Sequence, residues 1–580
     1  MNPEALLAGL DDQQRVAAEA LVGPVCMLAG AGTGKTRAIT HRIAYGVATG
    51  AYAPNRVMAL TFTARSAAEL RGRLRQLGAG GVSARTFHAA ALSQLGFFWP
   101  QVVGGSAPAI IDAKARVLAH AAERIHLKVD TATLRDAAGE IEWRKVSGLS
   151  IDEYAAVAGT RSLPGQLDLD RAIALQNAYE DLKDERRQLD FEDVLLAVAG
   201  MIEQEPAVAM QVREQYRFFV VDEFQDVSPL QYQLLRLWLG DRRDLCVVGD
   251  ASQTIYSFAG ARADYLLDFP SRFPDATVVR LEQNYRSAPP VIETANRLMR
   301  GRPGALTLLP AGDTDGVPGA DVTERAYQTD IGEARGVAQR VLELIEGGAK
   351  AEDIAVLFRV NVQSAALEQS FAEAGVSYQV RGAKRFFDLP EVKQAILALR
   401  AASVSIAGEP LFKSVSDVLR SMGWSQSAPE VRGAVRDRWE SLDAIMGLVD
   451  EAPAGTTFRA FTDELLERQR SQHEPTVSAV TFATLHSAKG LEWDHVFVVG
   501  LSEGLVPISY ARTFEQVDEE RRLLYVGITR ARRSLELSWA QVGTHQRGVR
   551  EPSRFLAELG SRTPRAAGSA APRSRLSSRR

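Results

Sequence analysis

Cysteine is scarce in this sequence: its 580 residues include only Cys26 and Cys246. Each lies within an apolar run, so we expect both thiols to be buried in a hydrophobic core. Two cysteines are too few for the disulfide framework of a small secreted domain, and too few for a four-cysteine zinc site. The cysteine content therefore excludes both of those classes.

Long apolar runs are absent as well. No window approaches the ~20 consecutive apolar residues that a membrane-spanning helix requires. The segment Met1–Leu10 also lacks the basic region and apolar stretch of a secretory signal peptide. We therefore expect a cytoplasmic protein with no membrane partner.

A general excess of positive charge is the third missing feature. The 68 lysines and arginines are outnumbered by 72 aspartates and glutamates, and the formal net charge is −4. A nucleic-acid partner would therefore have to bind through local basic and aromatic surfaces. The strongly basic segment 561–580 contains six arginines and no acidic residue. Its Ala, Ser and Pro content predicts a disordered tail.

The sequence does contain a series of short apolar runs that precede helical patterns. This alternation predicts an α/β fold with two parallel sheets, each covered by helices on both faces. We expect strands of the first sheet at residues 25–28, 57–60, 218–221 and 245–248. We expect strands of the second at 277–281, 354–358, 478–481, 495–499 and 534–539.

Two stretches between these runs are rich in Ala, Leu, Glu and Arg and are predicted to be helical insertions. The division that follows is a first α/β domain (1–93 and 191–275) with the insertion 94–190, a second α/β domain (276–381 and 476–560) with the short insertion 382–475, and the tail 561–580.

The strongest chemical signal is a glycine-rich segment that follows the first strand and precedes a helical pattern. Glycines allow backbone N–H groups to fold around phosphates, and a helix N-terminus adds partial positive charge. Lys35 is expected to reach the β- and γ-phosphates of a nucleotide, and the Thr36 hydroxyl to ligate Mg²⁺. The segment consists of Ala29, Gly30, Ala31, Gly32, Thr33, Gly34, Lys35 and Thr36.

Two carboxylates end the strand at residues 218–221. Asp222 is predicted to lie near the Mg²⁺, and Glu223 to polarise the water that attacks the γ-phosphate. Acidic residues often end strands, so this pair is informative because it follows a phosphate-binding segment in chain order.

Several further segments are not explained by nucleotide binding alone. They read DEFQD at 222–226, GDASQTIYSF at 249–258, LEQNYRS at 281–287, TLHSAKGLEW at 484–493 and ERRLLYVGITRA at 520–531, with TFTA at 61–64 and TFH at 86–88. In this order they resemble the motifs of superfamily 1 DNA helicases of the UvrD/Rep/PcrA type, and the chain looks similar to actinobacterial UvrD-like members.

The resemblance implies two RecA-like P-loop motor domains that bind ATP and Mg²⁺ in the cleft between them. It implies an ATP-dependent single-stranded DNA translocase and helicase, moving 3′ to 5′, in DNA repair or replication. The implied partners are single-stranded DNA and junctions of single- and double-stranded DNA, together with repair or replication proteins. A bacterial, nucleoid-associated monomer or DNA-assembled dimer is expected.

The resemblance also assigns residues to the nucleotide. Gln14 is similar to the glutamine that reads adenine, and Tyr285 to the residue that stacks on it. Arg286 and Arg530 resemble the two arginine fingers of the second motor domain, which stabilise γ-phosphate charge. The remaining members of the implied set are Gln253 (coupling of the γ-phosphate to the DNA site), Glu492 (a ribose contact) and Arg37.

For DNA, the resemblance implies bases stacked on aromatic side chains at Phe62, Tyr256 and Phe258. Backbone contacts are expected from Thr86, His88, Thr484 and His486.

Two alternatives stay open beside the helicase. A protein-displacing translocase that unwinds weakly without a partner is allowed by the short insertion 382–475. A regulatory clamp that binds nucleotide and DNA without hydrolysis is opposed by the presence of every implied catalytic residue, namely Lys35, Asp222, Glu223, Arg286 and Arg530.

Overall fold

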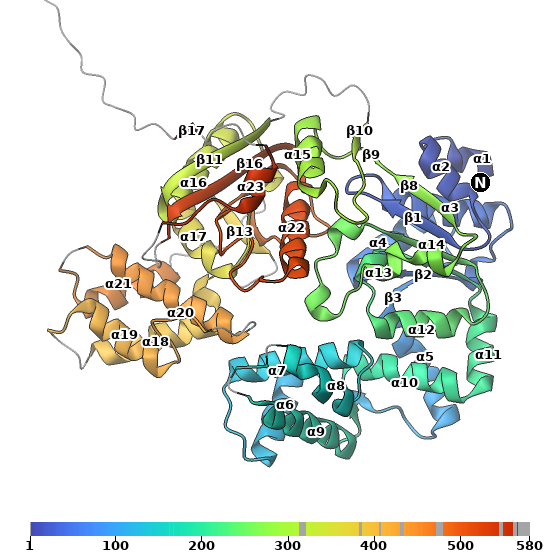
Figure 1. Cartoon of the computed structure of the whole chain (residues 1–580), viewed down its shortest axis with the longest axis horizontal. Helices are drawn as coiled ribbons and strands as arrows, with labels where there is room; N and C mark the ends of the chain where they lie inside the picture. Colours follow the sequence, from blue (N-terminus) through green and yellow to red (C-terminus); the bar gives the residue numbers. More distant parts are fainter. Residues whose placement is uncertain are drawn as a thin grey trace, which may run out of the picture. The chain divides into compact units, whose positions relative to one another are not determined.

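The computed structural model describes residues 2–161, 163–165, 167–311, 321–381, 386–404, 408–429, 434–453, 455–470, 479–543, 549–560 and 565–566. The chain divides into two compact units (Figure 1). Unit 1 comprises Met1–Ser287, Met299–Asp315 and Ser425–Glu440, and unit 2 comprises Ala288–Leu298, Gly316–Trp424 and Ser441–Arg580.

Unit 1 is built on a parallel six-stranded sheet of order β3-β2-β6-β7-β1-β8. Its strands are β1 (Val25–Ala29), β2 (Val57–Thr61), β3 (Ser83–Thr86), β6 (Phe218–Val221), β7 (Leu245–Gly249) and β8 (Thr277–Leu281). The inner strands are almost entirely apolar, as is usual in a parallel sheet with both faces covered.

Helices cover the two faces of this sheet. Alternate strand residues enter two separate hydrophobic clusters, one with side chains of α5, α10 and α12 and the other with those of α2, α3 and α4. The helices of unit 1 outside the insertion are α1 (Pro3–Leu7), α2 (Asp12–Glu19), α3 (Lys35–Ala48), α4 (Ala64–Gln76), α5 (Phe87–Val102), α10 (Phe191–Gln204), α11 (Pro206–Gln215), α12 (Pro229–Leu239), α13 (Asp264–Leu267) and α14 (Phe269–Arg272).

The first insertion forms a small helical layer with its own core. It contains α6 (Lys114–Arg124), α7 (Thr131–Val146), α8 (Ile151–Val157) and α9 (Leu169–Glu185), and the short strands β4 (Ala109–Ile110) and β5 (Gln188–Leu189) pair at its base.

Unit 2 is built on a second parallel sheet, of order β13-β14-β12-β15-β16-β11-β17. Its strands are β11 (Asp321–Thr329), β12 (Ile354–Phe358), β13 (Tyr378–Arg381), β14 (Val480–Thr484), β15 (Trp493–Val498), β16 (Ala531–Val542) and β17 (Arg565–Ala566). The associated helices are α15 (Pro289–Met299), α16 (Asp330–Glu346), α17 (Ser364–Glu373), α22 (Phe514–Ile528) and α23 (Arg554–Glu558).

The second insertion is helical in its described residues. Its helices are α18 (Pro390–Ser403), α19 (Leu411–Ser421), α20 (Ala434–Glu451) and α21 (Phe458–Arg470). The short strands β9 (Gln283–Asn284) and β10 (Leu309–Pro310) pair outside both large sheets.

The predicted α/β class with two parallel sheets is confirmed, and Cys26 and Cys246 are buried free thiols as predicted. One strand differs from the prediction: β8 pairs with β1 at the edge of the first sheet, although we placed residues 277–281 in the second. Helix α5 also crosses the boundary that we set at residue 94. The domain division otherwise stays a prediction, and the tail 561–580 lies outside the described residues except at 565–566.

Within the described part of the chain, no helix is long and apolar enough to cross a membrane.

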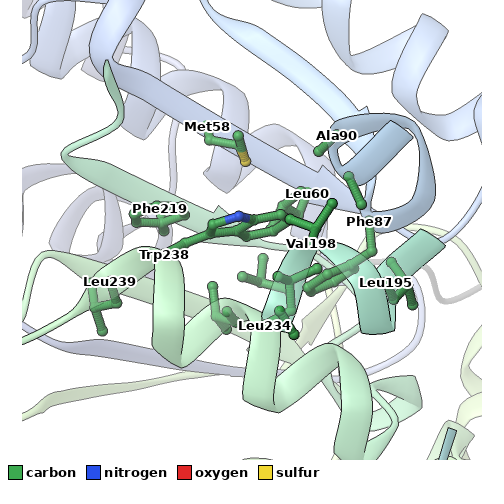
Figure 2. Close-up of a cluster of buried hydrophobic side chains, with 14 of the residues drawn as sticks. Met58, Leu60, Phe87, Ala90, Leu195, Val198, Phe219, Leu234, Trp238 and Leu239 are labelled. Carbon is green, nitrogen blue, oxygen red and sulfur yellow. The ribbon is translucent and has the colours of Figure 1, made fainter. Parts of the chain in front are cut away.

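Trp238 of α12 lies at the centre of the larger core cluster of unit 1 (Figure 2). Its ring lies parallel to that of Phe87, with centroids 6.0 Å apart, and to that of Phe219 at 6.4 Å. The indole Nε1 donates a hydrogen bond of 2.8 Å to Oε1 of the buried Gln94 on α5. A large apolar ring with a satisfied polar atom therefore joins α5 and α12 to the sheet.

Replacing Trp238 by Phe removes this donor and leaves a buried acceptor, which costs about 1–3 kcal/mol. We expect W238F and Q94L each to lower the stability of unit 1, and the double variant to lose less than the sum of the two. Thermal unfolding followed by circular dichroism measures all three. Strictly additive losses would contradict the proposed role of the hydrogen bond.

Glu333, in the first turn of α16, is a buried carboxyl of unit 2. Its Oε1 accepts hydrogen bonds from the Gly500 N–H (2.9 Å) and the Ser538 hydroxyl (2.6 Å). Burial is the largest effect on this group and raises its pKa to about 7. The folded protein therefore retains a proton that the unfolded chain releases near its ordinary pKa of 4.5.

Because the folded pKa is raised, the contribution of Glu333 to stability is complete below pH 4.5 and is lost as pH rises through about 7. We expect the free energy of unfolding of the wild type to fall relative to that of E333Q as pH rises from 4.5 to about 7. The decrease is at most ~1.4 kcal/mol per pH unit. Melting curves at pH 5, 6, 7 and 8 test this. A difference that does not change with pH would show that Glu333 does not titrate there.

Candidate nucleotide and DNA sites

The glycine-rich segment forms a tight turn between β1 and α3. Gly32 (φ 71°) and Gly34 (φ 77°) adopt left-handed backbone conformations, which L side chains rarely tolerate. Helix α3 begins at Lys35, and its N-cap Gly34 makes no side-chain capping bond. The turn therefore delivers the first N–H groups of α3 as possible anion donors.

Three side chains or backbone groups from other segments hold this turn. Asn284 Nδ2 donates to the Ala31 carbonyl (2.7 Å), and Gln14 Nε2 donates to the Thr33 carbonyl (3.0 Å). The Tyr285 N–H donates to the Gly32 carbonyl at 2.9 Å. Because hydrogen bonds hold three successive carbonyls of the turn, the loop backbone is preorganised before a ligand binds.

The space around the turn is too tight for larger residues. A Cβ on Gly32 would lie 2.5 Å from Asn284 Nδ2 and 2.8 Å from Arg286 Cβ, and a Cβ on Gly34 would lie 2.7 Å from Gln14 Nε2. Arg286 is therefore beside the turn and within unit 1, whereas the resemblance assigned it to the second motor domain.

The two carboxylates follow β6 next to this turn. Glu223 is one of the few non-glycine residues with positive φ (53°), and its carboxylate lies 3.7 Å from Lys35 Nζ. Such backbone strain persists where the surroundings fix it, and it clusters at functional sites. The Glu223 N–H donates to Asp222 Oδ1 at 3.0 Å.

Asp222 is held in a low-dielectric position. Burial, followed by the charge of Glu223, raises the pKa of Asp222 to about 7. Mg²⁺ commonly takes one or two protein carboxylates and completes its shell with water and substrate phosphates. Asp222, with Thr36 in the first turn of α3, fits this mode of binding.

A polar chain leads from Glu223 across the sheet edge. Gln225 Nε2 donates to the Glu223 carboxylate, and Gln225 Oε1 accepts from the Asp250 N–H (3.0 Å). Gln253 Nε2 donates to Asp250 Oδ2 at 2.7 Å. Gln253 was predicted to couple two sites, and the structure connects it to Glu223 in this way.

Beside the turn, the two predicted adenine contacts, Gln14 and Tyr285, lie in one region with the predicted nucleotide-binding residue Arg37. Tyr285 is 53% exposed, and its hydroxyl donates to Asp11 Oδ2 at 2.6 Å. Burial and this hydrogen bond raise the pKa of Tyr285 to about 12. Asp11 caps α2, which carries Gln14, and the Arg37 guanidinium donates to the Gly9 carbonyl. Gln14, Arg37 and Tyr285 therefore surround the same end of the turn.

The aromatic residues predicted to contact DNA gather at the carboxyl ends of β2 and β7. Phe62 and Tyr256 stack with centroids 5.6 Å apart and planes at 14°, and Phe258 meets Tyr256 edge-on at 6.2 Å. Phe62 and Phe258 are 46% and 61% exposed. Because the Phe62 and Tyr256 rings already stack on each other, no base fits between them. A base would therefore stack on an outer face of this cluster.

Thr86 and His88 lie at the start of α5. The Thr86 hydroxyl accepts from the Ala89 N–H (3.1 Å) and caps the helix. The His88 ring meets the exposed Phe191 edge-on at 6.0 Å, and burial lowers the pKa of His88. Among the described residues, no hydrogen-bond partner reaches the buried His88 Nε2.

In unit 2, Thr484 ends β14 and exchanges hydrogen bonds with Ser487, at 2.9 Å between the hydroxyls and 3.2 Å from the Ser487 N–H. Burial, and then the charges of Arg359 and Lys489, lower the pKa of His486 to about 3. His486 is therefore neutral at physiological pH and is suited to a hydrogen bond rather than to an ion pair with phosphate.

Two predicted nucleotide contacts of unit 2 have partners within that unit. Glu492 pairs with Arg532 at 2.6 Å. The Arg530 guanidinium donates to the Val526 carbonyl (2.9 Å), the Leu491 carbonyl (3.1 Å) and the Thr529 hydroxyl (3.0 Å). The guanidinium and the carboxylate each keep hydrogen-bonding capacity beyond these contacts, since Arg530 has five N–H donors and Glu492 has a second carboxylate oxygen.

Asn284, Gln225 and Asp250 were missed as candidate site residues. All three lie inside the motif segments quoted above, next to residues that were selected. Amide and carboxylate side chains can each make two or more hydrogen bonds, and this property could have identified all three as residues that hold the site together.

Comparison with family models and with similar sequences shows the protein family of this chain. Residues 10–274 match the UvrD/REP helicase N-terminal domain, and residues 279–428 and 409–542 match the UvrD-like helicase C-terminal domain. The ATP-dependent DNA helicase UvrD2 of Mycobacterium tuberculosis (strain ATCC 25618 / H37Rv) is 48% identical over 583 residues, which cover 97% of this chain and 83% of that protein.

The chain belongs to the UvrD/Rep helicase family.

More distant relatives match a similar share of the chain at lower identity. DNA helicase II of Escherichia coli (strain K12) is 29% identical over 96% of this chain and 88% of its own length. The ATP-dependent DNA helicase PcrA of Bacillus subtilis (strain 168) is 28% identical over 96% of this chain and 86% of its own length.

The geometry of the turn predicts a sharp effect of Gly32→Ala. Its Cβ meets Asn284 and Arg286, so we expect the loop to open and ATP binding to weaken at least tenfold, measured with a fluorescent ATP analogue. Gly50→Ala is the matched control, because Gly50 has the same left-handed conformation (φ 77°) with open space around it. Both variants bear a backbone cost of about 1–2 kcal/mol. Equal nucleotide affinity in the two variants would contradict this assignment.

Proposed function

We propose that this chain is an ATP-dependent DNA helicase that moves along single-stranded DNA by hydrolysing ATP. The observation that carries the proposal is the polar chain Glu223–Gln225–Asp250–Gln253 in unit 1. It begins at the carboxylate beside Lys35 and ends three residues before Tyr256 in the aromatic cluster. A group that senses the γ-phosphate is thereby connected to a surface suited to bases.

In the proposed reaction, Lys35 and the N–H groups of the turn bind the phosphates, and Glu223 aligns the attacking water. Mg²⁺, held by Thr36 and Asp222, would neutralise charge on the β- and γ-phosphates. Arg286 and Arg530 are proposed to stabilise the charge that develops on the γ-phosphate. The tight turn around residues 30–34 and the 3.7 Å approach of Lys35 to Glu223 support this assignment.

Glu492 is proposed to contact the ribose, and Gln14, Arg37 and Tyr285 the base. For DNA, Phe62, Tyr256 and Phe258 provide stacking surfaces worth ~1–3 kcal/mol per base without reading sequence. Thr86, His88, Thr484 and His486 are proposed to contact the strand backbone. Stacking without base readout suits a motor that must pass over any sequence.

The finer proposals are movement from 3′ to 5′, action at junctions in repair or replication, and work as a monomer or a DNA-assembled dimer beside the nucleoid. A second candidate, a translocase that unwinds only with a partner protein, is favoured by the short second insertion, residues 382–475.

ATP hydrolysis with and without single-stranded DNA, together with strand displacement on 3′-tailed and 5′-tailed duplexes, tests the function. We expect DNA-stimulated hydrolysis and displacement of the 3′-tailed duplex. Glu223→Gln should lower stimulated hydrolysis at least ~100-fold, because the water loses its base. Glu19→Gln, which removes an exposed carboxylate paired with Arg15, is the control and should change neither activity.

Stimulated hydrolysis without displacement would favour the partner-dependent translocase. Hydrolysis that DNA does not stimulate would contradict the motor, and DNA binding without any hydrolysis would indicate a regulatory clamp.

A further inference from the structure

Two strand ends in unit 2 bring an arginine to the predicted DNA contacts. Strands β12 and β14 are parallel neighbours, with Phe358 in register with Thr484. The Leu485 N–H donates to the Phe358 carbonyl at 2.8 Å. Arg359, which follows Phe358, therefore lies beside the segment that carries Thr484 and His486. The electrostatic effect of Arg359 on His486 agrees with this proximity.

Arg359 is held by a carboxylate from a different element. Its Nε lies 2.9 Å from Glu520 Oε2 and its Nη2 lies 2.7 Å from Glu520 Oε1, a two-point ion pair. The side chains are only 11% and 7% exposed. Glu520 Oε2 also accepts from the Ile508 N–H at 3.2 Å. Planar pairing of this kind fixes the direction of a guanidinium as well as neutralising it.

Glu520 stands on α22, the helix that leads to Arg530. The two residues are ten positions apart, which corresponds to about 15 Å along a helix. At the end of α22, Thr529 Oγ donates to the Tyr525 carbonyl (2.9 Å) and Arg530 Nε to the Val526 carbonyl (2.9 Å). Helix α22 thus carries both the carboxylate that holds Arg359 and the Val526 carbonyl that accepts from Arg530.

We propose that Glu520 is a positioning residue for DNA binding by unit 2, fixing Arg359 against the Thr484–His486 segment and tying that segment to α22, the helix that leads to Arg530. This inference deepens the proposed function and rests on it. Glu520 itself touches neither DNA nor nucleotide in this account. Its removal should therefore impair the response to DNA and spare hydrolysis without DNA.

The test uses the full-length chain with Glu520→Gln, Glu520→Asp and a matched control. Glutamine keeps the size of the side chain but cannot accept two charged hydrogen bonds from the guanidinium, whereas aspartate keeps the charge. Glu558→Gln is the control. Glu558 belongs to α23 and pairs with Arg521, the residue next to Glu520 on α22 (Nη2 to Oε1, 2.8 Å).

Fluorescence anisotropy with labelled oligothymidylate gives the affinity for single-stranded DNA, and melting curves give the stability. We expect E520Q to weaken DNA binding and to raise the half-saturating DNA concentration for hydrolysis at least fivefold. Hydrolysis without DNA should stay within twofold of the wild type. E520D should lie closer to the wild type than E520Q, and E558Q should change the melting temperature only.

Equal DNA affinities in E520Q and E558Q would overturn the inference, since Glu520 would then be structural only. Tighter DNA binding by E520Q would also overturn it, because Glu520 would then screen Arg359 from phosphates instead of positioning it. Absence of DNA-stimulated hydrolysis in the wild type would overturn the proposed function, a result that is separate from the comparison of affinities between variants.

Discussion

The left-handed backbone at Gly32 and Gly34 is the constraint on which the nucleotide site depends. Only glycine adopts this conformation at low cost, and only glycine fits beneath Asn284 and Gln14. The surrounding segments are arranged to hold these two residues. Side-chain amides from α2 and β9 hold two carbonyls of the turn, and the turn leads into the N-terminus of α3, where phosphate is proposed to bind.

The parallel strands of the first sheet bring other functional residues close to that turn. Strands β1, β2, β6 and β7 are neighbours with the same direction, so their carboxyl ends meet at one edge of the sheet. The turn follows β1, the carboxylates follow β6, and the aromatic cluster follows β2 and β7. Ligand sites at this edge are expected for open α/β sheets. Side-chain amides then need to span only short gaps to connect phosphate chemistry with DNA stacking.

Much of this could be predicted because the signals are local. A glycine-rich segment between a strand and a helix specifies a phosphate turn, and an apolar strand ending in two carboxylates specifies its acidic partner. The buried strands β6 and β12 have the predicted bounds, since continuous apolar runs mark them. Polar strand β11 gave no such signal.

The rest depends on contacts between distant residues. The membership of β8 in the first sheet is set by its pairing with β1, some 250 residues earlier in the chain, which a periodicity does not reveal. The ion pairs of Glu492 with Arg532 and of Arg359 with Glu520 likewise join residues that are distant in the sequence and come together only in the folded unit 2. Sequence could select Glu492 by its motif, but it could not show the partner that now holds it.

ATP hydrolysis is proposed to drive this chain along a single strand of DNA. The most direct test is displacement of streptavidin from oligonucleotides biotinylated at either end. We expect ATP-dependent displacement from the 5′ end, which a motor moving 3′ to 5′ reaches, and little from the 3′ end. No ATP-dependent displacement from either end, by a preparation that binds both DNA and nucleotide, would contradict it.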